Sequence, residues 1–375
     1  MNINFFMPTR VIMAEDCVRK NCALLKEMGH TALLVTGGNS ARRSGSLEDV
    51  QFALDSLDIR YYIYDKVMAN PTISCVYEGA AYAKNHKVDF VIGIGGGSPM
   101  DAAKAIALLA AQDIKEEELF SGNFKKKVLP LVMIPTTAGT GSEVTPYSIL
   151  TNDKSQTKTS ISTPLIFPKL AFLDAKYMNQ LPMMVTITTT LDALSHAIEG
   201  ILSVRSTDMT NFIAMESIKR ITQCLSFLSP DKGDNISNLT IDIREKLLYG
   251  SMLAGIVIAH TGTTAVHSMG YSLTYFKNID HGRANALLLP SFLRFTAKYN
   301  SEIVKKILTY MGLDSIDEFE ALFLRLLGDR EQITQKELER FTGIAINAKN
   351  IPNSKVVPTK EDIINIYSRS LQIEY

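Results

Sequence analysis

Two pairs of side chains in the second half of the chain have the types and spacing of metal ligands. Asp192 and His196 are four residues apart, so on a helix they share one face and can reach the same ion. His267 and His281 follow in a stretch of helical periodicity that also contains His260. One carboxylate and three imidazoles suit Fe²⁺ or Zn²⁺ and leave coordination positions for a substrate. Each residue alone is more often a cap, a surface group or a hydrogen-bonded core residue, so the prediction depends on the set.

A glycine-rich segment in the first half follows an apolar run and precedes a helical pattern. Glycines let the backbone approach an anion without an intervening Cβ, and a helix N-terminus suits a pyrophosphate. We expect Ser98 to cap this helix, Pro99 to take its first position and Asp101 to complete a capping box. The segment departs from the GxGxxG fingerprint, so a tight strand-to-helix turn is the alternative interpretation. The predicted phosphate-binding residues are Gly95, Gly96, Gly97, Ser98, Pro99, Met100 and Asp101.

A second loop, residues 134–145, also follows an apolar run and is dense in hydroxyl groups. It contains Thr136, Thr137, Thr140 and Thr145. Such a loop can present several donors to a phosphate or a ribose, and a purely structural loop rarely needs so many. Two loops that follow strands of one parallel sheet meet at its carboxyl edge, where ligands bind in such folds.

The elements that must position these residues change in character near residue 180. Apolar runs come first, at 31–36, 60–64, 89–94 and 128–134, and helical patterns separate them, at 47–57, 73–85 and 102–111. Longer helical periods follow, at 183–203, 207–228, 239–260, 262–275 and 284–298, with a surface turn at 229–235. Continuous apolar strands between helices indicate a mostly parallel sheet covered on both faces. We therefore predict an α/β dinucleotide-binding domain over 1–180 and an all-helical domain over 181–375.

Composition limits the classes of partner. The chain has 39 basic and 39 acidic side chains, so nothing favours nucleic acid or an anionic membrane. No apolar run approaches the roughly 18 residues of a membrane span. The four cysteines are scattered without a CxxC pair, as free thiols of a reducing compartment are, and the first residues lack the features of a signal peptide. We expect a cytoplasmic protein.

In order and spacing, the motifs resemble the iron-containing (group III) alcohol dehydrogenase family, most closely its 1,3-propanediol and butanol dehydrogenase branch. The resemblance is carried by 95–101, 135–151, 192–200 and the pair His267 and His281. It implies a metal-dependent enzyme that transfers a hydride between NAD(P)(H) and a small primary alcohol, diol or aldehyde. It also implies an active site in the cleft between the two domains, and a homodimer or higher homo-oligomer. The stretch from Asn2 to Met13 would either pair across such a dimer or complete its own sheet.

The resemblance further implies roles for individual residues. Asp192, His196, His267 and His281 would bind the metal, with Fe²⁺ first and Zn²⁺ as the alternative. Gly97 to Asp101 would hold the pyrophosphate, and the four threonines of the second loop would line the cofactor. Asn70 and Lys158 match further cofactor contacts of the family.

The chain departs from NAD-preferring relatives directly after the run at 31–36. Those relatives have an Asp there, which would bond the adenosine ribose, and this chain has Gly37. Loss of the carboxylate removes repulsion toward a 2′-phosphate, which polar and guanidinium groups can bind. The candidates are Gly37, Asn39 and Ser40, with Arg42 and Arg43 close behind. We predict NADP(H) over NAD(H); the alternative is that both arginines are solvated surface charges.

A second departure is Tyr271, where many relatives carry a further histidine four residues after the one that matches His267. Tyr271 and His260 are the candidates for the proton relay of that histidine, although a wall residue is the simpler interpretation of Tyr271. Alternative functions are a glycerol dehydrogenase, a dehydroquinate synthase-like lyase, or a non-catalytic nucleotide-binding protein. The lyase needs several basic residues near its metal, and 188–200 and 260–283 contain few, with Arg283 the clearest. A complete ligand set argues against a non-catalytic protein.

Overall fold

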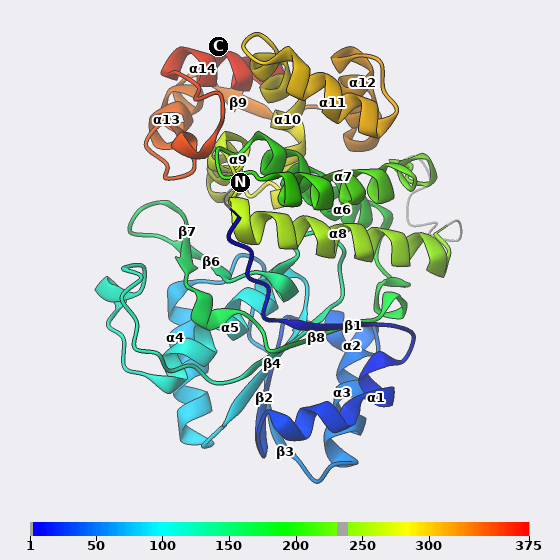
Figure 1. Cartoon of the computed structure of the whole chain (residues 1–375). Coiled ribbons are helices and arrows are strands. Elements are labelled where there is room, and N and C mark those ends of the chain that lie inside the picture. Colours follow the sequence, from blue (N-terminus) through cyan, green and yellow to red (C-terminus); the bar gives the residue numbers. More distant parts are fainter. Residues whose placement is uncertain (1–2, 231–238, 375) are drawn as a thin grey trace. The chain divides into compact units, whose positions relative to one another are not determined.

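The computed structural model describes residues 3–230 and 239–374 of the chain. The chain divides into two compact units, Phe6–Gln180 and Leu181–Tyr375, the second of which includes Met1–Phe5. Figure 1 shows the elements of both units. The turn predicted at 229–235 lies, from residue 231 onward, outside the described residues.

The N-terminal unit is built on a six-stranded parallel sheet with strand order β1-β8-β5-β4-β2-β3. Its strands are β1 (Arg10–Met13), β2 (Thr31–Thr36), β3 (Arg60–Tyr64), β4 (Phe90–Gly95), β5 (Leu131–Pro135) and β8 (Leu170–Leu173). The predicted α/β sheet is thereby confirmed, and β1 completes this sheet by pairing with β8. The strand expected at 128–134 begins only at Leu131, because Pro130 has no N–H to give to the ladder.

Both faces of the sheet are buried, which explains the continuous apolar runs. Along β2, Leu33 and Val35 enter one hydrophobic cluster, whereas Ala32 and Leu34 enter another. Alternate strand residues point to opposite faces, so each cluster marks one face. The first cluster also contains α4 (Ile73–Asn85) and α5 (Gly97–Ala111), and the second contains α1 (Cys17–Lys20) and α3 (Ser46–Asp55) (Figure 1).

The carboxyl edge of the sheet is where the predicted cofactor loops begin. Thr36 of β2 is in register with Ile94 of β4, and Gly95 of β4 is in register with Pro135 of β5. The strand order reverses between β2 and β4, and dinucleotides bind outside such a reversal. The remaining elements of the unit are α2 (Ser40–Arg43), η1 (Cys22–Glu27), η2 (Glu116–Glu118), η3 (Ser142–Val144), η4 (Pro164–Ile166), η5 (Ala175–Met178) and a hairpin of β6 (Tyr147–Asn152) and β7 (Thr157–Ser162).

The start of α5 differs from the capping prediction. The N-cap is Gly96, whose backbone is extended, and Ser98 lies inside the first turn. The Ser98 hydroxyl instead accepts the Asn70 N–H at 3.3 Å. The carboxylate of Asp101 accepts from the Ser142 hydroxyl and from the Ile149 N–H, so it forms no capping box. Tertiary partners have replaced the local hydrogen bonds that the sequence suggested.

In its described residues the C-terminal unit is mainly helical, and the prediction of an all-helical unit is corrected by a short parallel pair of strands, β9 (Gln332–Thr334) and β10 (Gln372–Glu374). Its helices are α6 (Met183–Leu202), α7 (Asp208–Thr222), α8 (Ile241–Thr261), α9 (Ala265–Lys277), α10 (His281–Ala297), α11 (Ser301–Met311), α12 (Ile316–Leu327), α13 (Gln335–Ala345) and α14 (Lys360–Ser370), with single turns η6 (Leu225–Phe227) and η8 (Ile351–Asn353). The helix expected at 284–298 begins earlier, at His281, because the Asp280 side chain caps it through the Arg283 N–H. Within the described part of the chain, no helix has both the length and the apolar character needed to cross a membrane.

Candidate metal and cofactor sites

The four predicted metal ligands come from three helices of the C-terminal unit. Asp192 and His196 lie one turn apart on α6, His267 lies in the first turn of α9, and His281 is the first residue of α10. Ligand atoms of Asp192, His267 and His281 all lie within 4.8 Å of one another. The Nε2 atom of His196 is 2.9 Å from Nε2 of His267. The structure therefore brings all four side chains together, although their role as ligands stays a prediction.

The geometry and charge of this cluster fit a divalent cation. The Asp192 Oδ1 atom is 3.8 Å from Nε2 of His267 and 3.9 Å from Nε2 of His281. Ligands held at about 2.1 Å in a tetrahedron stand about 3.4 Å apart, between these separations and the 2.9 Å of the histidine pair. Burial by itself would raise the pKa of Asp192, but His196, His281 and His267 lower it to about 2. Asp192 is thus an anion among nitrogen donors.

Two glycines allow the helices to come close enough to form the cluster. A Cβ on Gly282 of α10 would lie 2.1 Å from the Thr188 carbonyl oxygen of α6. A Cβ on Gly270 of α9 would lie 2.2 Å from Oδ1 of Asn285 on α10. Real Cβ atoms do not make such contacts, so a larger residue at Gly282 would push α10 away from α6, and one at Gly270 would displace the Asn285 side chain.

Two buried polar side chains support the cluster. The Asn285 amide nitrogen donates to Asp192 Oδ1 at 3.0 Å and lies 3.1 and 3.2 Å from Nε2 of His267 and His281. Lone pairs that converge on one amide nitrogen can also converge on a cation. The Glu199 carboxylate contacts Nδ1 of His267 from the opposite side. Burial alone would raise the pKa of Glu199, but His267 and Thr264 hold it below its usual value.

The two relay candidates lie in different surroundings. The Tyr271 ring is stacked on His281, with centroids 5.6 Å apart, and meets His267 edge-on at 6.4 Å. It therefore borders the ligand cluster. His260 stacks on Phe5 at 4.1 Å, and its Nδ1 lies 2.7 Å from the Ile256 carbonyl oxygen.

The two predicted cofactor loops contact each other in the N-terminal unit. A Cβ on Gly96 would lie 3.2 Å from Oγ1 of Thr137, and one on Gly97 would lie 2.7 Å from Cγ2 of Thr140. Gly95 has φ +143°, a conformation that side chains disfavour. The glycine segment thus presents bare backbone beside the threonine loop, at the carboxyl edge of the sheet. Backbone without side chains at this edge suits the binding of a dinucleotide.

A buried lysine, Lys104, connects α5 to the second loop. This residue received no role from the sequence. The Lys104 ammonium, which is 0% exposed, donates to Ser142 Oγ at 2.7 Å, to Thr145 Oγ1 at 3.1 Å and to the Tyr147 carbonyl oxygen at 2.8 Å. Burial lowers the pKa of Lys104 to about 8, although Asp101 and Glu143 act in the opposite direction. The side chains of Asp101 and Thr145 therefore have partners inside the protein.

Other predicted cofactor residues gather at the same edge. Lys158 donates to the Asn70 side-chain oxygen at 2.6 Å, and the Asn70 N–H donates to the Ser98 hydroxyl.

The loop after β2 packs closely at Gly37. A Cβ on Gly37 would lie 3.1 Å from Cγ of Pro99 and 2.8 Å from the Val67 carbonyl oxygen. Pro99 and Met100 are buried in the first turn of α5, and Thr136 is buried directly after β5. Asn39, Ser40, Arg42 and Arg43 are exposed after β2.

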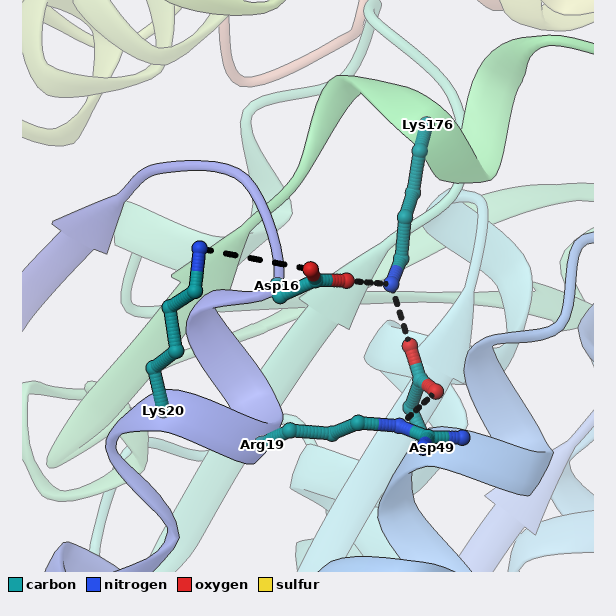
Figure 2. Close-up of a pocket in the computed structure, with 5 residues that line it drawn as sticks. All are labelled: Asp16, Arg19, Lys20, Asp49 and Lys176. Atoms are coloured by element: carbon teal, nitrogen blue, oxygen red, sulfur yellow. Dashed lines mark hydrogen bonds and ion pairs between the residues drawn. The ribbon is translucent and has the colours of Figure 1, made fainter.

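A charged pocket of the N-terminal unit contains none of the predicted site residues. The cavity, of about 400 Å³, is lined by Asp16, Arg19, Lys20, Asp49 and Lys176 (Figure 2). Its carboxylates are paired with its cations: Lys176 bridges Asp16 and Asp49, and Arg19 pairs with Asp49. Burial would lower the pKa of Lys176, but these hydrogen bonds raise it above its usual value. We interpret the pocket as a structural ion network.

Comparison with known proteins matches both units to one family. The sequence-family model described as iron-containing alcohol dehydrogenase matches residues 8–175. The family model for the C-terminal part of the Fe-containing alcohol dehydrogenases matches residues 186–371. The chain belongs to the iron-containing alcohol dehydrogenase family. Lactaldehyde reductase of Escherichia coli K12 is 33% identical over 293 residues, which are 77% of this chain and 74% of the relative. The 1,3-propanediol dehydrogenase of Klebsiella pneumoniae is 32% identical over 341 residues, 88% and 84% of the two chains.

Solved structures agree with this assignment. An iron-containing alcohol dehydrogenase from Thermotoga maritima superposes with a TM-score of 0.89 at 39% identity and covers 98% of this chain and 99% of that one. The predictions of family, fold class and reaction class are confirmed: the protein is an alcohol dehydrogenase or aldehyde reductase of the iron type, which uses a nicotinamide cofactor and a divalent metal.

Three residues that support the sites of this dehydrogenase received no role from the sequence. Glu199 follows Asp192 and His196 at helical spacing, so the shared helix face was a signal for it. Asn285 lies one turn after His281 and offered the same signal. Lys104 sits in an apolar helix, where a lone lysine predicts either an exposed side chain or a buried polar network.

Proposed function

We propose that this iron-type dehydrogenase prefers NADP(H) and acts on small primary alcohols, diols or the matching aldehydes, with Fe²⁺ at Asp192, His196, His267 and His281. The cluster of these four side chains, of which His281 is partly exposed and the other three are buried, is the observation that carries the proposal. A divalent cation held there supplies Lewis acidity toward an alcohol or carbonyl oxygen. The mixed oxygen and nitrogen donors accept Zn²⁺ as well, so availability decides between the two metals.

The protein residues contribute charge and position. Anionic Asp192 would offset part of the cation's charge, and the three imidazoles would supply nitrogen donors. We propose that the loops at 95–101 and 136–145, with Asn70 and Lys158, hold the nicotinamide cofactor, which accepts or delivers the hydride. Lys104, on the helix that follows the glycine segment, would hold the second loop in place through its hydrogen bonds to Ser142 and Thr145. The ring of Tyr271, which is stacked on His281, would form a wall of the substrate site beside the ligands.

The preference for NADP(H) is supported by the loop after β2. A side chain at Gly37 would collide with the Val67 carbonyl, so this backbone excludes the aspartate that would repel a 2′-phosphate. Arg42 and Arg43 are exposed close by. We expect the double variant Arg42→Ala/Arg43→Ala to weaken NADPH binding by about 10-fold or more with little effect on NADH.

A cation elsewhere on the same sheet provides the control for this test. Arg60 is exposed at the first position of β3, the end opposite to the loop. Arg60→Ala should leave both dissociation constants unchanged. Equal losses for NADPH and NADH in the double variant would contradict a 2′-phosphate site.

The lyase alternative receives no support from the basic residue that favoured it most. Arg283 donates to Glu331 at 2.6 Å and to the carbonyl oxygens of Leu327 and Asp329. The donors of its guanidinium therefore already have acceptors within the protein, which makes it unsuited to hold a carboxylated, phosphorylated substrate.

An anaerobic assay on metal-stripped protein tests the proposal as a whole. The protein would be reloaded with Fe²⁺ or Zn²⁺, supplied with NADPH or NADH, and tested on C2 to C4 aldehydes. We expect metal-dependent oxidation of NADPH that exceeds oxidation of NADH. No turnover with any combination, despite bound metal and cofactor, would favour the non-catalytic alternative.

We further propose a cytoplasmic homodimer or higher homo-oligomer. The four cysteines are free thiols, as in proteins of a reducing compartment. Light scattering of the purified protein would contradict the assembly if the mass corresponded to a single chain of 41.5 kDa.

A further inference from the structure

Glu199 is a buried carboxylate whose contacts all lead to the start of one neighbouring helix. It lies on α6, seven residues after Asp192, and is 0% exposed. A charge in such a position is costly unless hydrogen bonds satisfy both oxygens. Both oxygens have partners here, and the partners are the backbone and side chains of Thr264 and His267.

One oxygen of Glu199 serves as the cap that α9 lacks in its own sequence. The N-cap residue Thr264 makes no capping hydrogen bond with its side chain. Instead, Oε1 of Glu199 accepts the Thr264 N–H at 2.8 Å, the Thr264 hydroxyl at 2.7 Å and the His267 N–H at 3.4 Å. A carboxylate at a helix N-terminus satisfies unpaired donors and interacts favourably with the helix dipole.

The other oxygen of Glu199 holds the imidazole of His267. Oε2 contacts Nδ1, and a carboxylate can only accept, so the proton resides on Nδ1. In the neutral imidazole, Nε2 on the far side of the ring then carries a lone pair, and it lies 2.9 Å from His196 Nε2. The same carboxylate thus fixes both the backbone that carries His267 and the tautomer of its ring.

We propose that Glu199 is a positioning residue that sets the metal affinity of this dehydrogenase by orienting His267 and keeping its Nε2 free of a proton. The proposal rests on the metal site proposed above. Partners of this kind, which hold the second nitrogen of a metal-binding histidine, change metal affinity by about 10–100-fold when they are replaced.

Two near-isosteric variants separate this role from capping alone. In Glu199→Gln, the amide has two orientations. If its NH₂ group faces Nδ1, then Nδ1 must accept and the imidazole proton moves to Nε2. If the amide is flipped, its NH₂ group faces the N–H donors of the cap and the cap is lost. In Thr264→Val, the hydrogen bond from the Thr264 hydroxyl to Glu199 is lost, but the backbone hydrogen bonds of the cap and the contact between Glu199 and His267 are kept. A purely structural Glu199 predicts similar effects of both variants on melting temperature and on metal affinity.

The experiment is an anaerobic titration of each metal-stripped protein with Co²⁺ in the presence of a competing chelator, followed by the visible spectrum of the bound ion. We expect Glu199→Gln to bind Co²⁺ about 10–100-fold more weakly than wild type, with an altered spectrum, while Thr264→Val binds as wild type does. Equal affinities and spectra for wild type and Glu199→Gln would overturn the proposal. Failure of the wild-type protein itself to bind Co²⁺ would instead overturn the metal site on which it rests.

A second measurement needs no variant. Nitrogen-15 shifts of His267 in the metal-free wild-type protein should report a proton on Nδ1 and none on Nε2. The opposite tautomer would overturn the role of Glu199 even if Glu199→Gln failed to fold.

Discussion

Replacement of Gly282 by alanine should disrupt metal binding by pushing two helices apart. The added Cβ would lie 2.1 Å from the Thr188 carbonyl oxygen, 2.8 Å from its carbon and 3.1 Å from Cβ of Asp192. Carbon and oxygen atoms in close contact normally stay about 3.3 Å apart or more, so α10 must move by about 1 Å from α6. The obstacle is backbone within α6, which cannot rotate away as a side chain would.

The adjacent residue, His281, would move with the helix. Metal–ligand distances tolerate deviations of about 0.2 Å, so a shift of about 1 Å removes His281 from the set that includes Asp192. We expect Gly282→Ala to bind Zn²⁺ at least about 10-fold more weakly and, as an overpacked variant, to lose about 1–3 kcal/mol of unfolding free energy. Chelator competition and urea unfolding of the metal-stripped protein measure the two effects separately.

Gly343 provides a matched control in the same unit. It lies in α13, and a Cβ there would have no atom within 4 Å. Gly343→Ala should retain wild-type metal affinity and gain up to about 1 kcal/mol, the difference in helix propensity. If Gly282→Ala bound Zn²⁺ as tightly as wild type, the reasoning that the crossing of α6 and α10 positions the ligands would be refuted.

Two further predictions concern the N-terminal unit. The pKa of Lys104 is about 8 in the folded chain against 10.5 unfolded, so the unfolded chain binds more protons between these pH values and stability rises with pH there. Lys104→Met should lack this rise, which is worth at most about 3 kcal/mol of unfolding free energy. Urea unfolding of both proteins at pH 8 and pH 10.5 measures the difference, and parallel changes in the two proteins would contradict the prediction. Gly97→Ala should weaken NADPH binding in calorimetry, because its Cβ would lie 2.7 Å from Cγ2 of Thr140 and displace that side chain; an unchanged dissociation constant would show that Thr140 gives way freely.

The clustering of the four candidate metal ligands was partly predictable, because part of their arrangement is local. Asp192 and His196 share a face of α6 through helical spacing alone, and the sequence displays that spacing. Their meeting with His267 and His281 depends on how three helices pack, which follows from Gly270 and Gly282 only once the neighbours are known. The family resemblance supplied what local spacing lacked.

The cofactor loops show where sequence reasoning fails. Ser98 has the residue type of an N-cap, yet its hydroxyl accepts the N–H of Asn70, 28 residues away, and Gly96 occupies the N-cap position without a side-chain cap. Asp101 likewise turns to β6 rather than to its own helix turn. The strands β9 and β10 have three residues each and lie about 40 residues apart, so no periodicity reveals them. Contacts between distant segments decided each of these cases.

An anomalous difference map recorded at the iron absorption edge, from crystals of protein reloaded anaerobically with Fe²⁺, would test the metal site most directly. We predict one strong peak among Asp192, His196, His267 and His281, at about 2.0–2.2 Å from each ligand atom. A peak elsewhere, or no peak at these residues in crystals of active enzyme, would contradict the site on which the proposed function rests.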